Sequence, residues 1–260
     1  MKKVLMMIAL AGGVAGAGGA QAQSVVALLD GNRLAMVDVK GLSAAAPVKV
    51  SGVPGTLLGI DVRPADGKLY GLFADGTIAT IDPASGAATP KAKLDTMLAS
   101  GVAATVDFNP VADRLRVIGS DGVNLRANVD DGKVVKDGAL KFADADKAAG
   151  KMPMVVAGAY TNSMKGAKET ALYDVDGKLG VLLKQAPPND GVLNTVGPLG
   201  IQAQGFAFDI VAADAGASEG WLMAGPTLYR VDLSTGKATA AGKVKGVDGT
   251  VKDIAILPAM

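Results

Sequence analysis

Three arginines and two asparagines occupy alternate positions along one predicted hairpin of this chain. The first strand carries Arg114 and Arg116, and the second carries Asn124, Arg126 and Asn128, with apolar residues between them. Because successive side chains of a strand point to opposite faces, each polar set must lie on one side of its strand. Guanidinium groups removed from water need carboxylates, carbonyl oxygens or a bound anion. The hairpin therefore indicates either an anion-binding surface or an internal ion-pair network.

The expected internal partners of these arginines are four aspartates, Asp107, Asp113, Asp174 and Asp176. Arginines between sheets often form such structural pairs, and Asn or Asp residues in turns usually bond to their own backbone. A ligand site and a structural network are therefore both compatible with the pattern.

The elements that must position these residues belong to a repeat. A short apolar strand recurs every 50 residues or so, at residues 57–64, 105–110, 155–162, 205–210 and 253–258. A repeat of this length, built from short strands and tight turns, is typical of a β-propeller. The predicted fold is therefore an all-β propeller that forms a single domain.

Each repeat reads as a four-stranded blade with hairpin turns such as Asp75-Gly76, where glycine accepts the positive φ of the turn. The N-terminal strands 25–29 and 33–37 lack an inner strand, and residues 251–257 supply it. Pairing of these two ends closes the ring and leaves neither end blade with a free edge. We expect five blades, or six if residues 137–154, which fit the pattern poorly, contain another.

The unusual polar residues fall on particular turns of this propeller. With strands lettered A to D from the centre outward, the A–B and C–D turns share one side, here called the A–B face. Polar residues that converge there are a common location for ligands. Tyr160 is a candidate for stacking on a sugar or peptide, and the alternative, slightly favoured, is packing at the mouth of the channel. The predicted ligand-binding residues are Asn109, Asp113, Arg114, Arg116, Asn124, Arg126, Asn128, Tyr160, Thr161, Asn162, Asn189, Asp190 and Asn194.

Composition excludes several kinds of function. The chain has neither His nor Cys, so it has no Ser-His-Asp triad, no Cys-His dyad, no ordinary zinc site and no disulfide. A formal net charge of +1 and 4% aromatic residues argue against nucleic acid as a partner. Asp174-Val175-Asp176-Gly177 lacks the later ligands of a calcium loop. No cofactor and no metal are predicted.

The N-terminus has the pattern of a secretory signal peptide. Basic Lys2 and Lys3 precede a short apolar run, and Ala20-Gln21-Ala22 has the small-x-small form of a cleavage site. Residues 1–22 are therefore the predicted signal peptide, and residues 23–260 the mature propeller. We expect a periplasmic or secreted monomer, without a membrane span in the mature chain.

Several stretches resemble a bacterial family known as domain of unknown function 4394. They include residues 58–64, 106–110, 159–163 and 172–176, and the more specific matches are the hairpin of residues 113–117 and 124–128 and the segment Pro187-Pro188-Asn189-Asp190-Gly191. The resemblance implies exported, propeller-like proteins of unassigned role and supplies no catalytic residues.

The sequence favours a non-enzymatic binding module of the cell envelope. Its expected partner is a small polar or anionic ligand, a glycan, a peptide or another envelope protein, because arginine and amide donors suit carboxylates, phosphates and sugar hydroxyls. One alternative is an exported hydrolase or lyase acting on a glycan or lactone, with Asp113, Asp190 or Asp107 as acid or base. Another is a purely structural envelope protein whose arginines only hold blades together.

Overall fold

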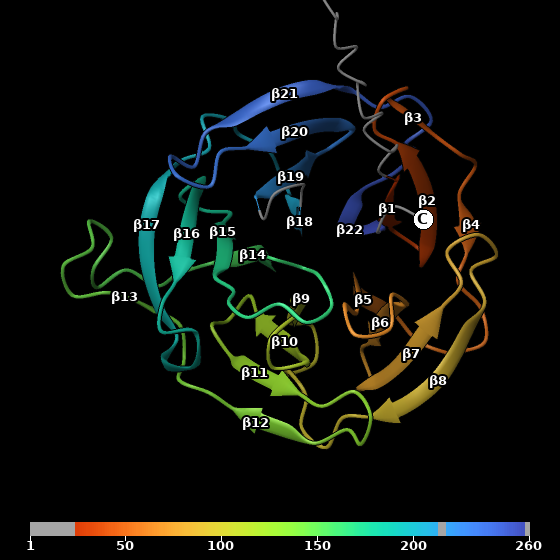
Figure 1. Cartoon of the computed structure of the whole chain (residues 1–260), viewed down its shortest axis with the longest axis horizontal. Helices are drawn as coiled ribbons and strands as arrows, with labels where there is room; N and C mark the ends of the chain where they lie inside the picture. The colour runs from red at the N-terminus through yellow and green to blue at the C-terminus, as the bar shows by residue number, and fades with distance from the viewer. Residues whose placement is uncertain (1–23, 213–216, 258–260) are drawn as a thin grey trace, which may run out of the picture.

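A computed structural model describes residues 24–212 and 217–257, and the predicted signal peptide lies outside these residues. Five sheets stand in a ring around a central axis (Figure 1). The strands are almost entirely antiparallel, and the one short helix among the described residues is the 3-10 turn η1 (Pro188–Asp190). The all-β propeller with five blades is confirmed.

We number the blades along the chain. Blade 1 consists of β22 (Val251–Leu257), β1 (Ser24–Leu29), β2 (Arg33–Asp38), β3 (Ser43–Ala44) and β4 (Val48–Lys49). Blade 2 consists of β5 (Leu57–Val62), β6 (Leu69–Phe73), β7 (Thr77–Ile81) and β8 (Ala88–Lys93). Blade 3 consists of β9 (Ala104–Asn109), β10 (Arg114–Gly119), β11 (Asn124–Ala127) and β12 (Val134–Lys136). Blade 4 consists of β14 (Val155–Tyr160), β15 (Leu172–Asp176), β16 (Val181–Gln185), β17 (Val192–Pro198) and the added β13 (Lys141–Phe142). Blade 5 consists of β18 (Ala207–Ala212), β19 (Ser218–Ala224), β20 (Thr227–Val231) and β21 (Ala238–Lys243).

The two ends of the chain close the ring as predicted. Inner strand β22 pairs antiparallel with β1, with Ser24 opposite Leu257 and Ala27 opposite Ile254. The pairing continues past the strands, where the Asp30 N–H donates to the Thr250 carbonyl (3.0 Å). Blade 1 is thus built from both ends of the chain, and β22 is its inner strand.

Residues 137–154 contain no sixth blade. Their one strand, β13, pairs in parallel with the outer strand β17, with Lys141 opposite Val192. This segment links blades 3 and 4 and extends blade 4 at the rim, which explains why it breaks the repeat pattern.

Each blade packs against a neighbour on both faces, and apolar side chains fill the space between adjacent blades. Blades 1 and 2, for example, share a core that includes Leu28 and Phe73. The junction of blades 3 and 4 differs. Of the strands β9–β12, Ile118 alone contributes to the buried apolar cluster there. Polar side chains occupy much of that junction instead.

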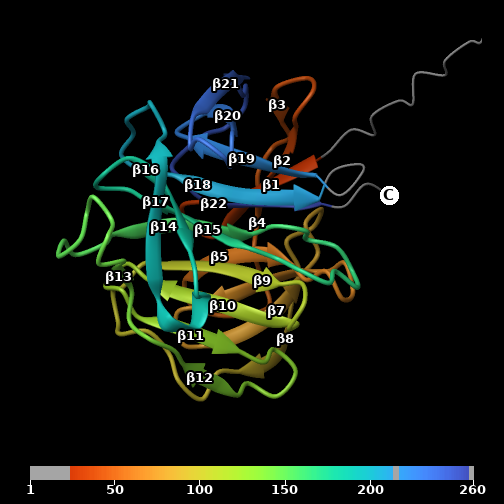
Figure 2. The same ribbon diagram turned by 60° about the vertical axis from the view of Figure 1, so that its left-hand side comes forward.

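Glycines in the C–D turns of blades 2 to 5 allow each of these turns to lie close against the preceding blade or its connection. Gly86, Gly132, Gly191 and Gly236 all have positive φ, between 68° and 81°. At each of them a Cβ atom would overlap a backbone carbonyl of the preceding blade or its connection, such as that of Lys93 for Gly132. In Figure 2 the outer strand β17 runs across the direction of the inner strands β9 and β18, as expected of a twisted blade. This twist brings each C–D turn against its neighbour.

No helix within the described ranges is long and apolar enough to cross a membrane.

Candidate functional site

The two arginines at the centre of the predicted hairpin lie directly opposite each other. Arg116 on β10 pairs with Arg126 on β11, so their side chains share one face of blade 3, as expected. This face is turned toward blade 4. Arg116 is 2% exposed, and Nε donates to the Tyr160 hydroxyl (3.1 Å) on β14.

Asp137 is the counter-ion of both arginines. Nη1 of Arg116 donates to Oδ2 of Asp137 (2.6 Å), and Nε and Nη2 of Arg126 donate to its two oxygens (2.5 and 2.8 Å). Burial raises the pKa of Asp137, but the hydrogen bonds from Arg126 and Arg116 more than offset this and the net pKa is lowered.

The four expected aspartate partners are therefore wrong for this hairpin. Asp113 pairs with Arg63 instead, and Asp176 accepts backbone N–H groups of its own turn. The carboxylate of Asp107 accepts the N–H of Tyr160. Neither carboxyl oxygen of Asp174 has a hydrogen-bond partner among the described residues.

Two asparagines complete the Arg116 network. Oδ1 of Asn124 accepts from Nη1 of Arg116 (2.9 Å), and Oδ1 of Asn189 accepts from Nη2 (2.9 Å). Asn124 in turn donates to the carbonyls of Gly138 and Pro188. The network therefore joins blade 3 to β14 and to η1 of blade 4.

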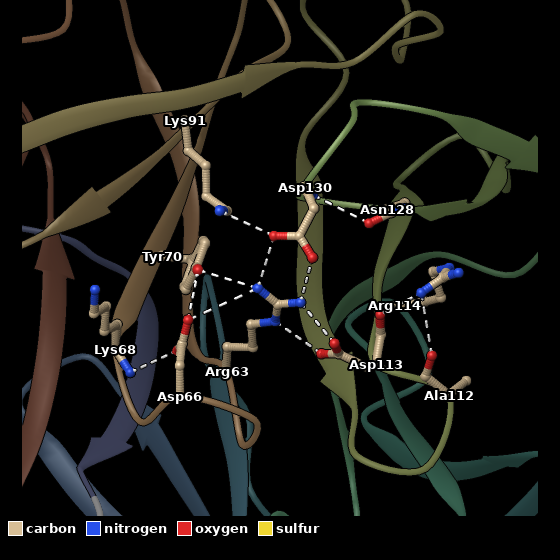
Figure 3. Close-up of polar contacts among 10 residues, drawn as sticks. All are labelled: Arg63, Asp66, Lys68, Tyr70, Lys91, Ala112, Asp113, Arg114, Asn128 and Asp130. Atoms are coloured by element: carbon tan, nitrogen blue, oxygen red, sulfur yellow. Dashed lines mark hydrogen bonds and ion pairs between the residues drawn. The ribbon is translucent and has the colours of Figure 1, made fainter.

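A second arginine network joins blades 2 and 3 (Figure 3). Arg63, which follows β5, donates from Nε and Nη2 to both oxygens of Asp113 (2.8 and 2.6 Å). Its Nη1 and Nη2 also donate to Asp130 (3.1 and 2.8 Å), and Lys91 adds an ion pair to Asp130 (2.9 Å). Hydrogen bonds from Arg63 and Lys91 lower the pKa of Asp130. Sequence reasoning missed Arg63.

The remaining predicted residues mostly bond to nearby backbone. Oδ1 of Asn109 accepts from the N–H groups of Val111 and Ala112, and Oδ1 of Asn128 accepts from that of Asp130. Asn194 donates to the carbonyls of Lys184 and Ala186. Arg114 donates to the carbonyls of Ala112 and Asp113. Thr161 accepts from the Ala171 N–H.

Two further predicted residues lie in blade 4 and differ in exposure. Asp190, in η1, is exposed. Tyr160 is 1% exposed, so its ring packs inside the junction and is not a stacking surface for a ligand. The structure thus brings Arg116, Asn124, Arg126, Tyr160 and Asn189 into one network, in which the first two and Tyr160 are buried, Arg126 is half-buried and Asn189 is exposed. The ligand-binding role of the thirteen residues stays a prediction.

Four aspartates surround the central axis on the inner strands: Asp61, Asp107, Asp209 and Asp253. Each accepts a backbone N–H from the next inner strand: Phe108 to Asp61 (2.6 Å), Tyr160 to Asp107 (2.9 Å), Ile256 to Asp209 (2.6 Å) and Ile60 to Asp253 (2.9 Å). The carboxylates therefore tie neighbouring inner strands together.

Three of these groups converge, because Asp61, Asp107 and Asp209 place oxygens within 4.8 Å of one another. Such oxygen-only donors are the type that hard cations such as Ca²⁺ prefer. Burial first, and then repulsion between the carboxylates, raises the pKa of Asp61 and Asp107 well above the ordinary range. Burial raises the pKa of Asp209 to about 6.

An open cleft lies on blade 5. It has a cavity volume of about 560 Å³ and lies where β19 begins, β20 ends and the C–D turn follows. Its polar lining comes from Ser218, Glu219, Arg230, Asp232, Ser234, Lys237 and Thr239. Blade 4 reaches this cleft through Asn162, whose N–H donates to Oγ of Ser218 (3.2 Å). Asn162 is thus the predicted site residue that touches the cleft lining.

Arg230 of the cleft is held by two neighbours. Its guanidinium lies 4.4 Å from the ring centre of Trp221, a cation–π contact. Nη1 of Arg230 lies 3.2 Å from Oε1 of Glu219. Sequence reasoning missed this cleft because its lining residues are ordinary surface types.

The catalytic alternative names three carboxyl groups, and that of Asp190 is exposed. Asp113 is held by Arg63, and Asp107 is buried at the axis with a raised pKa. Neither carboxyl group lines the cleft of blade 5.

Comparison with family models gives one match over most of the chain. The model described as "Domain of unknown function (DUF4394)" matches residues 33–255, which confirms the resemblance noted from the sequence. No curated protein matched.

Two solved structures of proteins of unknown function are similar to this chain. A protein of unknown function from Bacteroides thetaiotaomicron has a TM-score of 0.53 and 16% identity, covering 92% of this chain and 74% of that one. A protein of unknown function from Bacteroides caccae has a TM-score of 0.45 and 10% identity, covering 91% and 99%. At these identities the likeness concerns the fold alone.

Proposed function

This chain belongs to the DUF4394 family, and we propose that it is a binding module that holds a small hydroxyl-rich ligand in the blade 5 cleft. The observation that carries the proposal is the cleft itself. Its volume of about 560 Å³ falls within the roughly 300–1,000 Å³ typical of small-molecule sites. Its lining combines charged groups of both signs with three hydroxyl groups.

The lining suits a saccharide, and in particular one that carries a carboxylate. The guanidinium of Arg230 is a planar fork that can bind a carboxylate with two hydrogen bonds, and Trp221 holds it in place. Lys237 adds a second positive charge. The hydroxyl of Thr239 can both donate and accept hydrogen bonds, as sugar hydroxyls require. Those of Ser218 and Ser234 donate to Asn162 and Asp232 and can still accept.

In this proposal the arginines of the two networks do not contact the ligand. Four N–H groups of Arg116 already have protein acceptors, and Arg63 is shared by two carboxylates. We assign these arginines to holding blades 2, 3 and 4 in place. The ligand contacts are assigned to blade 5.

The proposed place of action is the periplasm or the medium. The supporting observation is the signal-peptide pattern of residues 1–22. Expression of the full chain in a bacterium, followed by N-terminal sequencing of the exported protein, should give Gln23 as the first residue. Retention of the intact chain in the cytoplasm would overturn this part.

Binding is tested with two probes that differ in one group, glucuronate and glucose. Calorimetric titration should show tighter binding of glucuronate, because only glucuronate offers a carboxylate to Arg230. Arg230→Ala should weaken glucuronate binding about tenfold or more, the loss expected for a charge-assisted hydrogen bond. Lys93→Ala, which removes an exposed cation of blade 2, is the matched control and should leave binding unchanged. Absence of binding for both probes would overturn the proposal.

A further inference from the structure

Asp174, on β15, is a buried carboxyl group that receives no hydrogen bond. Its side chain is fully buried, and neither Oδ1 nor Oδ2 has a partner within the described part of the chain. Its cross-strand neighbour is Gly158, where a Cβ atom would overlap Oδ1 of Asp174. Gly158 therefore leaves the space that this carboxyl group fills.

Asp174 shares one face of blade 4 with Tyr160, whose hydroxyl accepts from Arg116 across the junction of blades 3 and 4. Burial raises the pKa of Asp174, and the charge of Arg116 opposes this. The other titratable groups at this junction are Arg126 and Asp137 from blade 3, Asp107 from β9, Tyr160 from β14 and the buried Asp176 on the same face of β15. Arg116 already donates to Tyr160, Asn124, Asp137 and Asn189. Asp174 thus faces a guanidinium whose hydrogen bonds are nearly all in use.

The same face of blade 4 holds a second buried acceptor without a donor. Oε1 of Gln185 has no partner among the residues that the structure describes. Gln185 lies opposite Leu172, and Asp174 lies opposite Leu183 on the same pair of strands, so both side chains share a face. Acceptors exceed donors on this face, and a proton on Asp174 turns one charged acceptor into a neutral group with a donor. Burial accordingly raises the pKa of Asp174 to about 8, although Arg116 opposes the shift.

We propose that Asp174 is a proton-controlled latch at the junction of blades 3 and 4. As a neutral acid it leaves Arg116 bonded to Tyr160 and Asn189. As a carboxylate it competes for the Arg116 guanidinium and loosens those bonds. The proposal does not depend on any ligand in the blade 5 cleft.

The latch would act on the loop that follows β14. Tyr160 is the last residue of β14, and residues 161–171 connect it to β15. Asn162 of this loop donates to Ser218. Release of Tyr160 from Arg116 therefore predicts faster opening of residues 161–171 at alkaline pH.

The first test compares the pH dependence of stability in the wild type, Asp174→Asn and the control Asp144→Asn, which changes an exposed aspartate. Because Asp174 binds its proton more tightly in the folded state, the free energy of unfolding should fall as pH rises toward and through about 8. Urea unfolding between pH 5 and 9 should show a steeper fall for the wild type and the control than for Asp174→Asn. The difference between the slopes of the wild type and Asp174→Asn should approach the value for one bound proton per molecule. Equal slopes in all three proteins would overturn the proposal.

The second test needs only the folded wild type. The assigned ¹³C carboxyl resonance of Asp174 should still report the protonated form at pH 6. Amide hydrogen exchange of residues 161–171, corrected for the intrinsic effect of pH, should speed up as that resonance titrates. A resonance that is already ionised at pH 6, or exchange that does not follow it, would overturn the latch.

Discussion

Arg116 and Asp137 form an ion pair of 2.6 Å in which the two side chains are only 2% and 5% exposed. The pair lies at the junction of blades 3 and 4, where Ile118 is the one residue of β9–β12 in the buried apolar cluster. Arg116 also reaches blade 4 through Tyr160 and Asn189. It therefore contributes to how blades 3 and 4 fit together.

Arg116→Met should lower the free energy of unfolding by about 1–3 kcal/mol, because it leaves the side-chain oxygens of Asn124 and Asn189 without their donor and Asp137 with Arg126 alone. Urea unfolding followed by Trp221 fluorescence measures the change. Lys93→Met is the control, since Lys93 pairs with Asp75 at an exposed site and its loss should change stability by less than about 1 kcal/mol.

The double variant Arg116→Met with Asp137→Leu should lose less stability than the sum of the losses in the two single variants. Each single variant already removes the Arg116–Asp137 ion pair, so the sum counts its loss twice. A double variant that loses the sum of the two single losses would contradict the coupling of these residues.

Gly132→Ala should destabilise the protein more than Gly101→Ala. Both glycines have positive φ, 77° and 83°, so both substitutions strain the backbone. A Cβ at Gly132 also meets the Lys93 carbonyl, whereas none of the described atoms lies within 4 Å of a Cβ at Gly101. The difference between the two melting temperatures measures the contact between blades 2 and 3. An equal drop in melting temperature in both variants would show that the backbone at Lys93 shifts to accept the Cβ at no cost in stability.

Stability should fall as pH rises from about 4 to about 6, in part through Asp209. Burial raises the pKa of Asp209 to about 6, compared with roughly 3.9 in an unfolded chain. The folded state therefore binds more protons in this range, and the free energy of unfolding decreases as they are lost. Asp209→Asn cannot ionise and should show a shallower dependence in urea unfolding. An unchanged slope would show that Asp209 is already ionised at pH 4.

Sequence reasoning succeeded where the repeat itself carries the information. The spacing of the apolar strands predicted the closure of residues 251–257 onto 25–37, and the alternation of Arg116 and Arg126 predicted that they share a face. Asp137 was missed because it begins the segment that breaks the repeat. Arg63 was missed because its partners lie 50 and 67 residues away, and only the ring geometry brings them together.

The blade 5 cleft was equally hidden, since Ser218, Arg230 and Lys237 belong to no motif. Their side chains meet only because β19, β20 and the C–D turn of blade 5 converge.

We assign the arginines of blade 3 to structure and Arg230 to ligand binding. The most direct test compares one variant of each kind with the same probe. Calorimetric titration of glucuronate into Arg126→Ala and Arg230→Ala measures both proteins under the same conditions. The affinity should stay at the wild-type value in Arg126→Ala, which should instead melt at a lower temperature, and should drop about tenfold or more in Arg230→Ala. Loss of affinity in Arg126→Ala with full affinity in Arg230→Ala would place the ligand at the blade 3 hairpin and contradict the account.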